Sequence, residues 1–234
     1  MGLCVCVGFA ADLKEHDLEG YENFKSEMAK VNQTLRAEGM PEHLEPDEVN
    51  AADFISLEMF GYSGLHYLRR IAAYINYTGK LPPPGDSDSS KDVLLEQYYT
   101  ESIQEKAPKG FLALFKKTPK RKAFEFNHLL HHSDCEGYYL PMEFTSVIFP
   151  DPKLKVAGEM IGSAPCLLRE CMRLAEALAI PHGIDPESDE LWDAADNQGQ
   201  GDGWHLYGVE AFTCVRLMHA CEASVRSGAA LVFA

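Results

Sequence analysis

The sequence has few positive charges for its size. Its 234 residues include 21 Lys and Arg against 36 Asp and Glu, which gives a formal net charge of -15. Because binding to phosphates needs clustered positive charge, we expect no general affinity for nucleic acid. The same excess of acid would be repelled by an anionic membrane surface.

Long apolar runs and secretory features are also missing. No stretch of the sequence approaches the roughly 20 apolar residues that a helix needs to cross a bilayer. The first residues lack the basic and apolar regions of a signal peptide. Seven cysteines, an odd number, favour reduced thiols. We therefore expect an acidic cytoplasmic protein that binds no membrane.

The motifs of phosphate binding and catalysis are absent or incomplete. No Gly-x-Gly-x-x-Gly follows the first predicted strand, and no Walker pattern occurs. In residues 61–65 the second glycine comes one position too early for a nucleophile elbow, and Ser63 is explained as a helix cap. A calcium loop counted from Asp196 would need Glu where Tyr207 stands. We expect no cofactor and a non-catalytic protein.

The spacing of apolar residues predicts an α+β fold. Helical periodicity and end signals mark residues 17–39, 63–79, 91–106, 163–181 and 206–228, with Asp17 and Ser163 as expected N-caps. Alternation marks strands at residues 3–9, 124–132, 138–140 and 230–233. We expect one domain, residues 1–234, in which four to five helices pack on a mixed or antiparallel sheet that includes both terminal strands. Flexible loops are expected near residues 80–92 and 182–203.

The predicted sheet includes a hairpin over residues 123–140. Aromatic and apolar residues alternate with polar ones up to His132, and residues 138–140 continue the pattern after a turn-like stretch. Titratable and aromatic side chains gather at the predicted tip, residues 131–139. We predict that a partner or small ligand is recognised there. The candidate ligand-binding residues are His132, Asp134, Glu136, Tyr138 and Tyr139.

A metal-assisted hydrolase is the first alternative, using His132, Asp134, Cys135 and Glu136. If residues 124–132 are extended, His128 and His132 share a face but lie roughly 13 Å apart, too far for one ion. A metal would then need the loop residues, chiefly His132, Asp134 and Cys135, together with a distant His66 or His205. We therefore predict no metal.

Two further charged features leave alternatives open. The acid excess is also typical of an inhibitor- or immunity-type protein that neutralises a basic partner. The basic stretch 109–122 is interpreted as a solvated lead-in to a strand, with a docking or import signal as its alternative. Arg69 and Arg70 are interpreted as an exposed helix face paired with acids. The partner itself is left as an unknown protein or small-molecule ligand.

The run His131-His132-Ser133-Asp134-Cys135-Glu136-Gly137-Tyr138-Tyr139-Leu140-Pro141, with Gly162-Ser163 before a helix, carries a resemblance. It is similar to a set of small cytosolic proteins, mostly bacterial, that share this hairpin motif and have no assigned activity. The resemblance implies a shared fold and a shared pocket. It implies no catalytic role for any residue.

Overall fold

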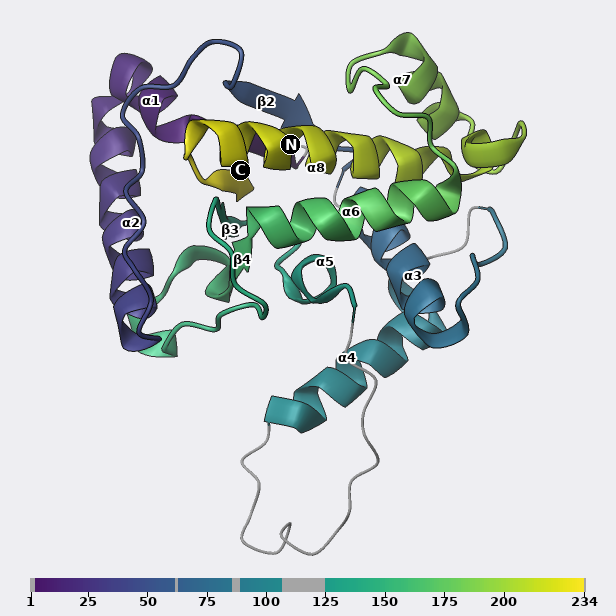
Figure 1. The fold of residues 1–234 in the computed structure, drawn as a ribbon, viewed down its shortest axis with the longest axis horizontal. Helices are drawn as coiled ribbons and strands as arrows, with labels where there is room; N and C mark the ends of the chain where they lie inside the picture. The colour runs from purple at the N-terminus through teal and green to yellow at the C-terminus, as the bar shows by residue number, and fades with distance from the viewer. Residues whose placement is uncertain (1–2, 62, 86–88, 107–124, 234) are drawn as a thin grey trace, which may run out of the picture.

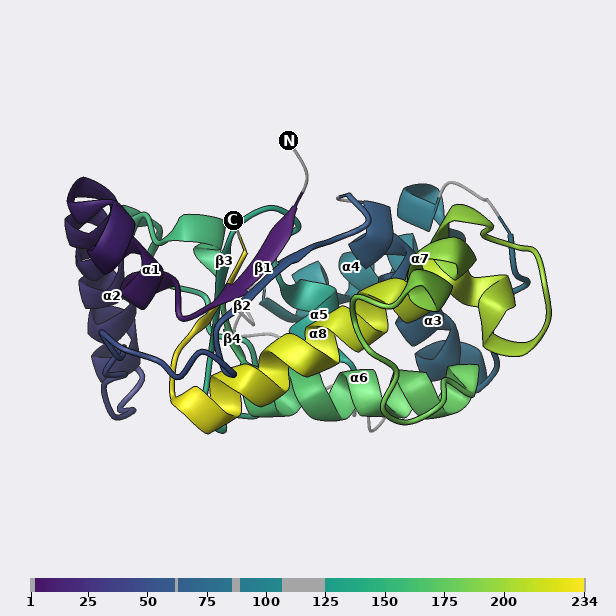
Figure 2. The ribbon, with the colours of Figure 1, turned by 90° about the horizontal axis from the view of Figure 1, so that it is seen from above.

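A computed structural model describes residues 3–61, 63–85, 89–106 and 125–233. The described residues form two groups of helices with a small sheet between them (Figures 1 and 2). Our prediction for the basic stretch 109–122 lies outside these residues. Among the described residues, no helix has the length and apolar character needed to cross a membrane.

Five short strands form one mixed sheet, which confirms the α+β class. The strands are β1 (Cys4–Val7), β2 (Ile55–Glu58), β3 (Gly137–Leu140), β4 (Ile161–Ser163) and β5 (Leu231–Phe233). Their order is β2-β1-β5-β3-β4, and only the β3–β4 pair is parallel. The two terminal strands, β1 and β5, are neighbours in the middle of the sheet, and both belong to it as predicted.

The described residues contain eight α-helices, more than the four to five that periodicity predicts. They are α1 (Phe9–His16), α2 (Leu18–Ala37), α3 (Ser63–Thr78), α4 (Val93–Lys106), α5 (Asn127–His131), α6 (Ala164–Leu178), α7 (Asp189–Asp196) and α8 (Gly208–Ser227). Short 3-10 turns lie at η1 (Ser89–Lys91), η3 (Pro152–Leu154), η4 (Ala157–Glu159) and η5 (Gly203–Tyr207). The long predicted helices are confirmed, whereas α1, α5 and α7 are additional.

Helices α1 and α2 cover one face of the sheet (Figure 2). Apolar residues of α2 recur at steps of three and four, so Tyr21, Phe24 and Met28 all point to this face and are buried. They pack in one cluster with Tyr138 of β3 and Val232 of β5. The Asp17 side chain accepts a hydrogen bond from the Gly20 amide at 3.0 Å and caps α2, as predicted.

The remaining helices pack on the opposite face in a larger core. Because successive strand residues alternate between faces, Tyr139 points away from its neighbour Tyr138 and joins this second cluster with Phe233. Helix α8 runs through the middle of the cluster beside α6 (Figure 1). Fourteen of its residues are buried, so most of its circumference faces protein.

The predicted strand over residues 124–132 is wrong, and with it the hairpin. The described part of this segment forms α5, and β3 pairs with β5 and β4 instead. Distant side chains impose the helix. The two carboxyl oxygens of Glu170 in α6 accept hydrogen bonds from the His128 and Leu129 amides at 3.0 and 2.8 Å, which satisfies free donors in the first turn. Residues 128–130 are all buried, so the alternation of residue types carries no information about faces here.

The expectation of a continuous loop over residues 182–203 is wrong in part. Residues 189–196 form α7, which begins after Ser188 and presents Leu191, Ala194 and Ala195 to the core. Three buried residues on one side of a two-turn helix give too weak a periodic signal to stand out within an acidic stretch. The loop near 80–92 likewise includes the η1 turn.

Candidate functional site: an exposed acidic surface

The titratable residues predicted at the hairpin tip are held by a buried arginine. Arg69 of α3 is 2% exposed. Its guanidinium donates to the carbonyl oxygens of Leu129 at 2.8 Å and His132 at 2.7 Å, and it pairs with the Asp134 carboxylate. Arg69 thus ties three points of the chain around α5 together. Our expectation that it pairs with an acid is confirmed, and our expectation that it lies on an exposed helix face is wrong.

Asp134 has two cationic or polar partners. Besides Arg69, His66 Nε2 lies 3.1 Å from Asp134 Oδ2. Burial raises the pKa of the Asp134 carboxyl, but the hydrogen bond from His66 and the charge of Arg69 outweigh it and hold that pKa well below its usual range. Asp134 is therefore ionised and already paired.

His132 lies inside the core. Its ring stacks on Tyr139 with 3.9 Å between centroids, and Nε2 lies 3.2 Å from the Tyr138 carbonyl oxygen. Burial lowers the pKa of His132 to about 4, so the ring is neutral at pH 7. A neutral imidazole held between a tyrosine ring and a backbone carbonyl is a packing residue.

The five candidate ligand-binding side chains do not meet in one pocket. Tyr138 and Tyr139 are buried on opposite faces of the sheet, and the Tyr139 hydroxyl donates to the His128 carbonyl at 2.9 Å. Glu136 is exposed and His132 is buried. Asp134 is the one member that combines a charge with partial exposure, and its oxygens have partners.

The alternative metal set is dispersed as well. Within the described ranges, no group of three or more His, Cys, Asp or Glu side chains is arranged to hold a metal ion. Cys135 is exposed and lies beside Ser133, 3.8 Å between sulfur and hydroxyl. Of the distant histidines, His66 reaches Asp134, whereas His205 pairs with Glu190 on another part of the molecule.

A different set of charged residues gathers around α7. We call it the acidic surface, and it comprises Asp185, Glu187, Asp189, Glu190, Asp193, Asp196 and Asp202. All seven side chains are exposed, and residues 182–203 include no Lys or Arg. In the part of the chain that the structure describes, none of the seven carboxylates lies within 4.0 Å of a Lys or Arg nitrogen. Glu190 has a partner in His205, at 3.1 Å.

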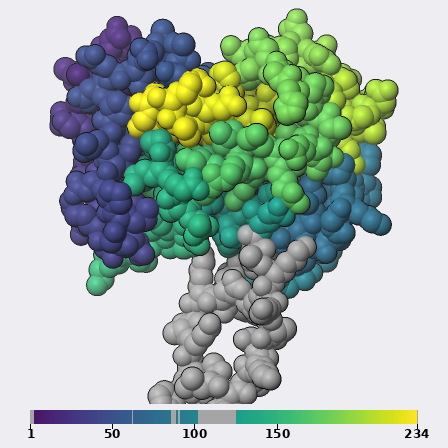
Figure 3. Space-filling view, viewed as in Figure 1, coloured from purple at the N-terminus to yellow at the C-terminus, as the bar shows by residue number. Residues whose placement is uncertain are grey.

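Helix geometry aligns part of the acidic surface. Asp189, Asp193 and Asp196 are separated by four and three residues, which places them on one face of α7. That face is opposite Leu191, Ala194 and Ala195, which anchor the helix. In the space-filling view the segment lies beside α8 and α6 on the same side of the molecule (Figure 3).

Aromatic and polar side chains pack closely under α7. The Trp192 and Phe212 rings lie 4.6 Å apart, and the Arg216 guanidinium sits 4.7 Å from the Trp192 ring centre. Arg216 Nε also donates to the Pro186 carbonyl at 2.9 Å. At the far end, the Gln198 side chain accepts from the Val209 amide and donates to Glu210, both at 2.8 Å.

A close backbone approach completes this packing. Gly208, the first residue of α8, lies so near α7 that a Cβ atom there would be 1.8 Å from the Ala194 carbonyl oxygen. Only glycine fits such a contact.

The acid-rich composition of residues 182–203 is visible in the sequence, but we interpreted the segment as a solvated loop. The signal that could have revealed the acidic surface is the absence of Lys and Arg, combined with the helical spacing of Leu191, Ala194 and Ala195.

Comparison with known proteins gives a family and no closer relative. No curated protein matches the chain, and no solved structure does. A family model described as "Putative DNA-mimic protein" matches residues 1–233.

This match corrects our expectation about the partner. A protein that imitates DNA acts by binding a protein that binds DNA, so the family implies a partner of that class in place of an unknown protein or small-molecule ligand. The expectation of a binding role is supported at this coarser level, as a role in protein interaction. The family match does not test the resemblance that is based on the motif at residues 131–141, so that resemblance stays a prediction. Because the family model covers nearly the whole chain, the protein belongs to this DNA-mimic family.

Proposed function

We propose that the protein binds a DNA-binding protein through the acidic surface, whose carboxylates take the place of DNA phosphates. The observation that carries the proposal is the set of seven exposed carboxylates in a segment without Lys or Arg. Family membership supports the class of partner. Of the functions considered from the sequence, the acidic protein that neutralises a basic partner is the nearest to this one.

The spacing of charge on α7 supports the proposal. With a rise of about 1.5 Å per residue, Asp189 and Asp196 lie about 10 Å apart along the helix axis, with Asp193 between them. A single DNA strand carries one phosphate per about 3.4 Å of axis, or about three over the same length. Three carboxylates on one face therefore approximate the linear charge density of one strand.

Rigidity adds to the effect of charge. Side chains and backbone that are already ordered lose less conformational entropy on binding. Helix α7 is fixed by the Trp192–Phe212 contact and by the approach of Gly208 to the Ala194 carbonyl. The partner would therefore meet a preformed array of carboxylates.

A second acid-rich region, α1 and α2, is less suited to this role. Its acids alternate with bases that pair with them. Lys14 lies 3.5 Å from Asp47 of the loop that follows α2, and Lys25 lies 3.9 Å from Glu22. Lys30 also pairs with Glu27 within α2. Paired carboxylates present a weaker and more mixed field to a basic partner.

The test measures release of DNA from its binding proteins. A labelled DNA duplex is bound to each member of a panel of purified DNA-binding proteins, and the protein is titrated in at low and at physiological salt. For at least one member, we expect release of the duplex that weakens steeply as salt rises. Replacing three carboxylates, Asp189→Asn, Asp193→Asn and Asp196→Asn, should weaken this competition by about tenfold, since each exposed charge contributes about 0.5 kcal/mol.

A matched variant separates local charge from net charge. Glu15→Gln, Glu22→Gln and Glu38→Gln remove the same number of exposed carboxylates from α1, from α2 and from the C-cap of α2. This variant should compete nearly as well as the unmodified protein. Equal losses in both variants would mean that only net charge matters, and the acidic surface would lose its special role. Competition that does not respond to salt would also contradict the proposal.

A further inference from the structure

A groove next to the acidic surface has a different character. It lies between α6 and α8, is closed at one end by the chain after Ile180, and encloses a cavity of about 480 Å³. Its floor is apolar and consists of Ala175, Ile180 and Val215, each 8% exposed. The volume is typical of ligand-binding clefts.

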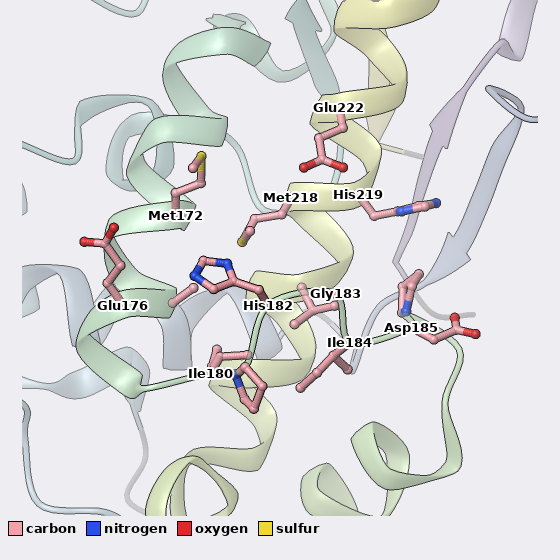
Figure 4. Close-up of a pocket in the computed structure, with 14 residues that line it drawn as sticks. Met172, Glu176, Ile180, His182, Gly183, Ile184, Asp185, Met218, His219 and Glu222 are labelled. Carbon is pink, nitrogen blue, oxygen red and sulfur yellow. The ribbon is translucent and has the colours of Figure 1, made fainter.

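Two methionines form the walls of the groove. Met172 of α6 is 44% exposed, and Met218 of α8 lies opposite. Figure 4 shows the Met218 sulfur and the His182 ring in the space between the two helices. Flexible, polarisable methionines are frequent where a surface accepts varied apolar side chains.

The rim of the groove is negative. Glu176 of α6, Glu222 of α8 and Asp185 of the connecting segment line it, and all three are exposed (Figure 4). Of the described residues that line the groove, none is Lys or Arg. Asp185 belongs to both the groove rim and the acidic surface, so the two features are continuous.

This combination selects the chemistry of an occupant. An apolar floor alone would accept any hydrophobic group, and an acidic rim alone would accept any cation. Long basic side chains have an apolar stem and a charged head, and they bury the stem while the head stays near water or a carboxylate. Arginine fits best, because its guanidinium is weakly hydrated, packs on apolar surfaces and pairs with carboxylates in a fixed geometry.

We propose that this groove binds an arginine side chain, together with an adjoining apolar residue, from the DNA-binding partner. The inference rests on the proposed function, because DNA-binding proteins carry arginines on the surface that meets DNA. The acidic surface supplies attraction over a distance, and the groove supplies a contact that depends on shape. The groove therefore selects among basic partners, which the acidic surface alone does poorly.

The test uses a short peptide as the probe. Acetyl-Leu-Arg-Leu-amide is titrated into the full-length protein labelled at the methionine methyl carbons, and the Met172 and Met218 methyl signals are followed by NMR. Both signals, assigned with Met172→Gln and Met218→Gln, should shift and saturate. The peptide with citrulline in place of arginine keeps the shape without the charge, and it should bind about two- to fivefold more weakly or not at all.

Two protein variants locate the contact. Glu222→Gln removes a rim charge from an exposed position and should weaken peptide binding about two- to fivefold. Glu38→Gln, at an exposed acid just after α2, should leave peptide binding unchanged. Equal binding of the arginine and citrulline peptides, or no shift of the two methyl signals, would overturn the inference.

The outcome is separable from that of the proposed function. The variant with Asp189, Asp193 and Asp196 replaced by Asn should still bind the peptide, because its groove is intact. If the protein releases DNA from a partner but does not bind the peptide, the proposed role of the groove is refuted and that of the acidic surface is kept. Peptide binding without any release of DNA would reject a DNA-binding partner as the source of the arginine, and the inference would fail as stated.

Discussion

Two regions of this molecule concentrate charged and titratable residues, and they differ in where their partners come from. Around α5, Arg69, His132 and Asp134 have their hydrogen bonds and ion pairs supplied by the protein itself. On the acidic surface, the carboxylates point to solvent, and Glu190 is paired with His205 alone. Among the described residues of the first region, most polar atoms are paired within the protein, with His66 Nδ1 and His128 Nε2 as buried exceptions, whereas the carboxylates of the second region are mostly left to solvent.

This difference shows that the types of residue in a cluster do not by themselves indicate a functional site. A cluster of His, Asp and Tyr suggests chemistry, but a side chain whose polar atoms are satisfied internally has little left to offer a partner. Repeated like charges at an exposed helix face repel one another, and the helix dipole offsets this repulsion only in the first turn. Such a face is better explained by a binding role. The predictions below separate the two regions by their effects on stability and on binding.

The largest effect is expected for Arg69→Met. Arg69 is buried and serves three carbonyl oxygens and the Asp134 carboxylate, so its removal leaves several acceptors and one charge without partners. We expect a loss of about 3–5 kcal/mol in the free energy of unfolding, measured by urea denaturation. The exposed pair of Arg173 with Glu125 provides a control, and Arg173→Met should cost about 1 kcal/mol or less.

Binding should respond differently to this change. At temperatures where Arg69→Met remains folded, its competition with DNA should equal that of the unmodified protein, because the acidic surface is untouched. Reduced competition by the folded variant would place part of the binding surface near α5. Similar stability losses for Arg69→Met and Arg173→Met would show that the region is not internally satisfied.

The next effect concerns the pH dependence around α5. Burial lowers the pKa of His132 from 6.5 to about 4, so the unfolded chain takes up a proton there more readily than the folded protein. The contribution of neutral His132 is therefore full above pH 6.5 and is lost as the pH falls toward 4. The stability advantage over His132→Gln should shrink by about 3 kcal/mol across this window, at about 1.4 kcal/mol per pKa unit.

Glu170 gives the opposite slope. Burial raises the pKa of this carboxyl from 4.5 to about 8 despite its two backbone donors, so the folded protein binds the proton more tightly than the unfolded chain. Its contribution is full below pH 4.5 and is lost as the pH rises toward 8. The advantage over Glu170→Gln should thus grow on acidification. Slopes of the same sign for the two variants in thermal unfolding at several pH values would contradict the assigned environments.

Long periodic elements could be predicted from the sequence, and the candidate site could not. Helices α2, α3, α6 and α8 have sustained apolar stripes, and the caps Asp17 and Ser163 occupy their expected places. These signals are local, and the structure preserves them. The prediction of a strand over residues 124–132 failed because the conformation of this segment depends on Glu170 and Arg69. These residues are distant in sequence and were not predicted to contact it.

Burial decided the meaning of each charged cluster, and a single sequence does not reveal burial. The pattern of His131 to Tyr139 looks the same whether its side chains face solvent or core. The sequence shows that residues 182–203 are acidic, but it did not reveal that residues 189–196 form a helix. Helix α7 has only about two turns, and the contacts of Trp192 and Gly208 between α7 and α8 stabilise it. Short helices owe their stability to such tertiary contacts.

A third, smaller effect is expected for Gly208→Ala. The added methyl would meet the Ala194 carbonyl oxygen and force α7 away from α8. We expect a loss of about 1–3 kcal/mol in stability and faster hydrogen exchange of the α7 amides, with weaker competition for DNA-binding partners. Gly39→Ala, at an open position with φ of +72°, should cost about 1 kcal/mol and leave both exchange in α7 and binding unchanged. Unaltered α7 exchange in Gly208→Ala would argue against the close approach.

The smallest effects are expected at the two ends of α7, where replacing an aspartate should change the stability in opposite directions. Asp189 lies in the first turn, where the helix dipole favours a negative charge, so Asp189→Asn should cost about 0.3–0.5 kcal/mol. Asp196 ends the same helix, where the dipole opposes its charge and Asp193 repels it, so Asp196→Asn should stabilise by about 0.3–0.5 kcal/mol. Both changes should nevertheless weaken competition with DNA. Thermal unfolding and DNA release on the two variants measure this directly. A carboxylate whose removal improves stability but impairs binding is explained by the partner and not by the fold, whereas Asp196→Asn that destabilises the protein would assign this residue a structural role.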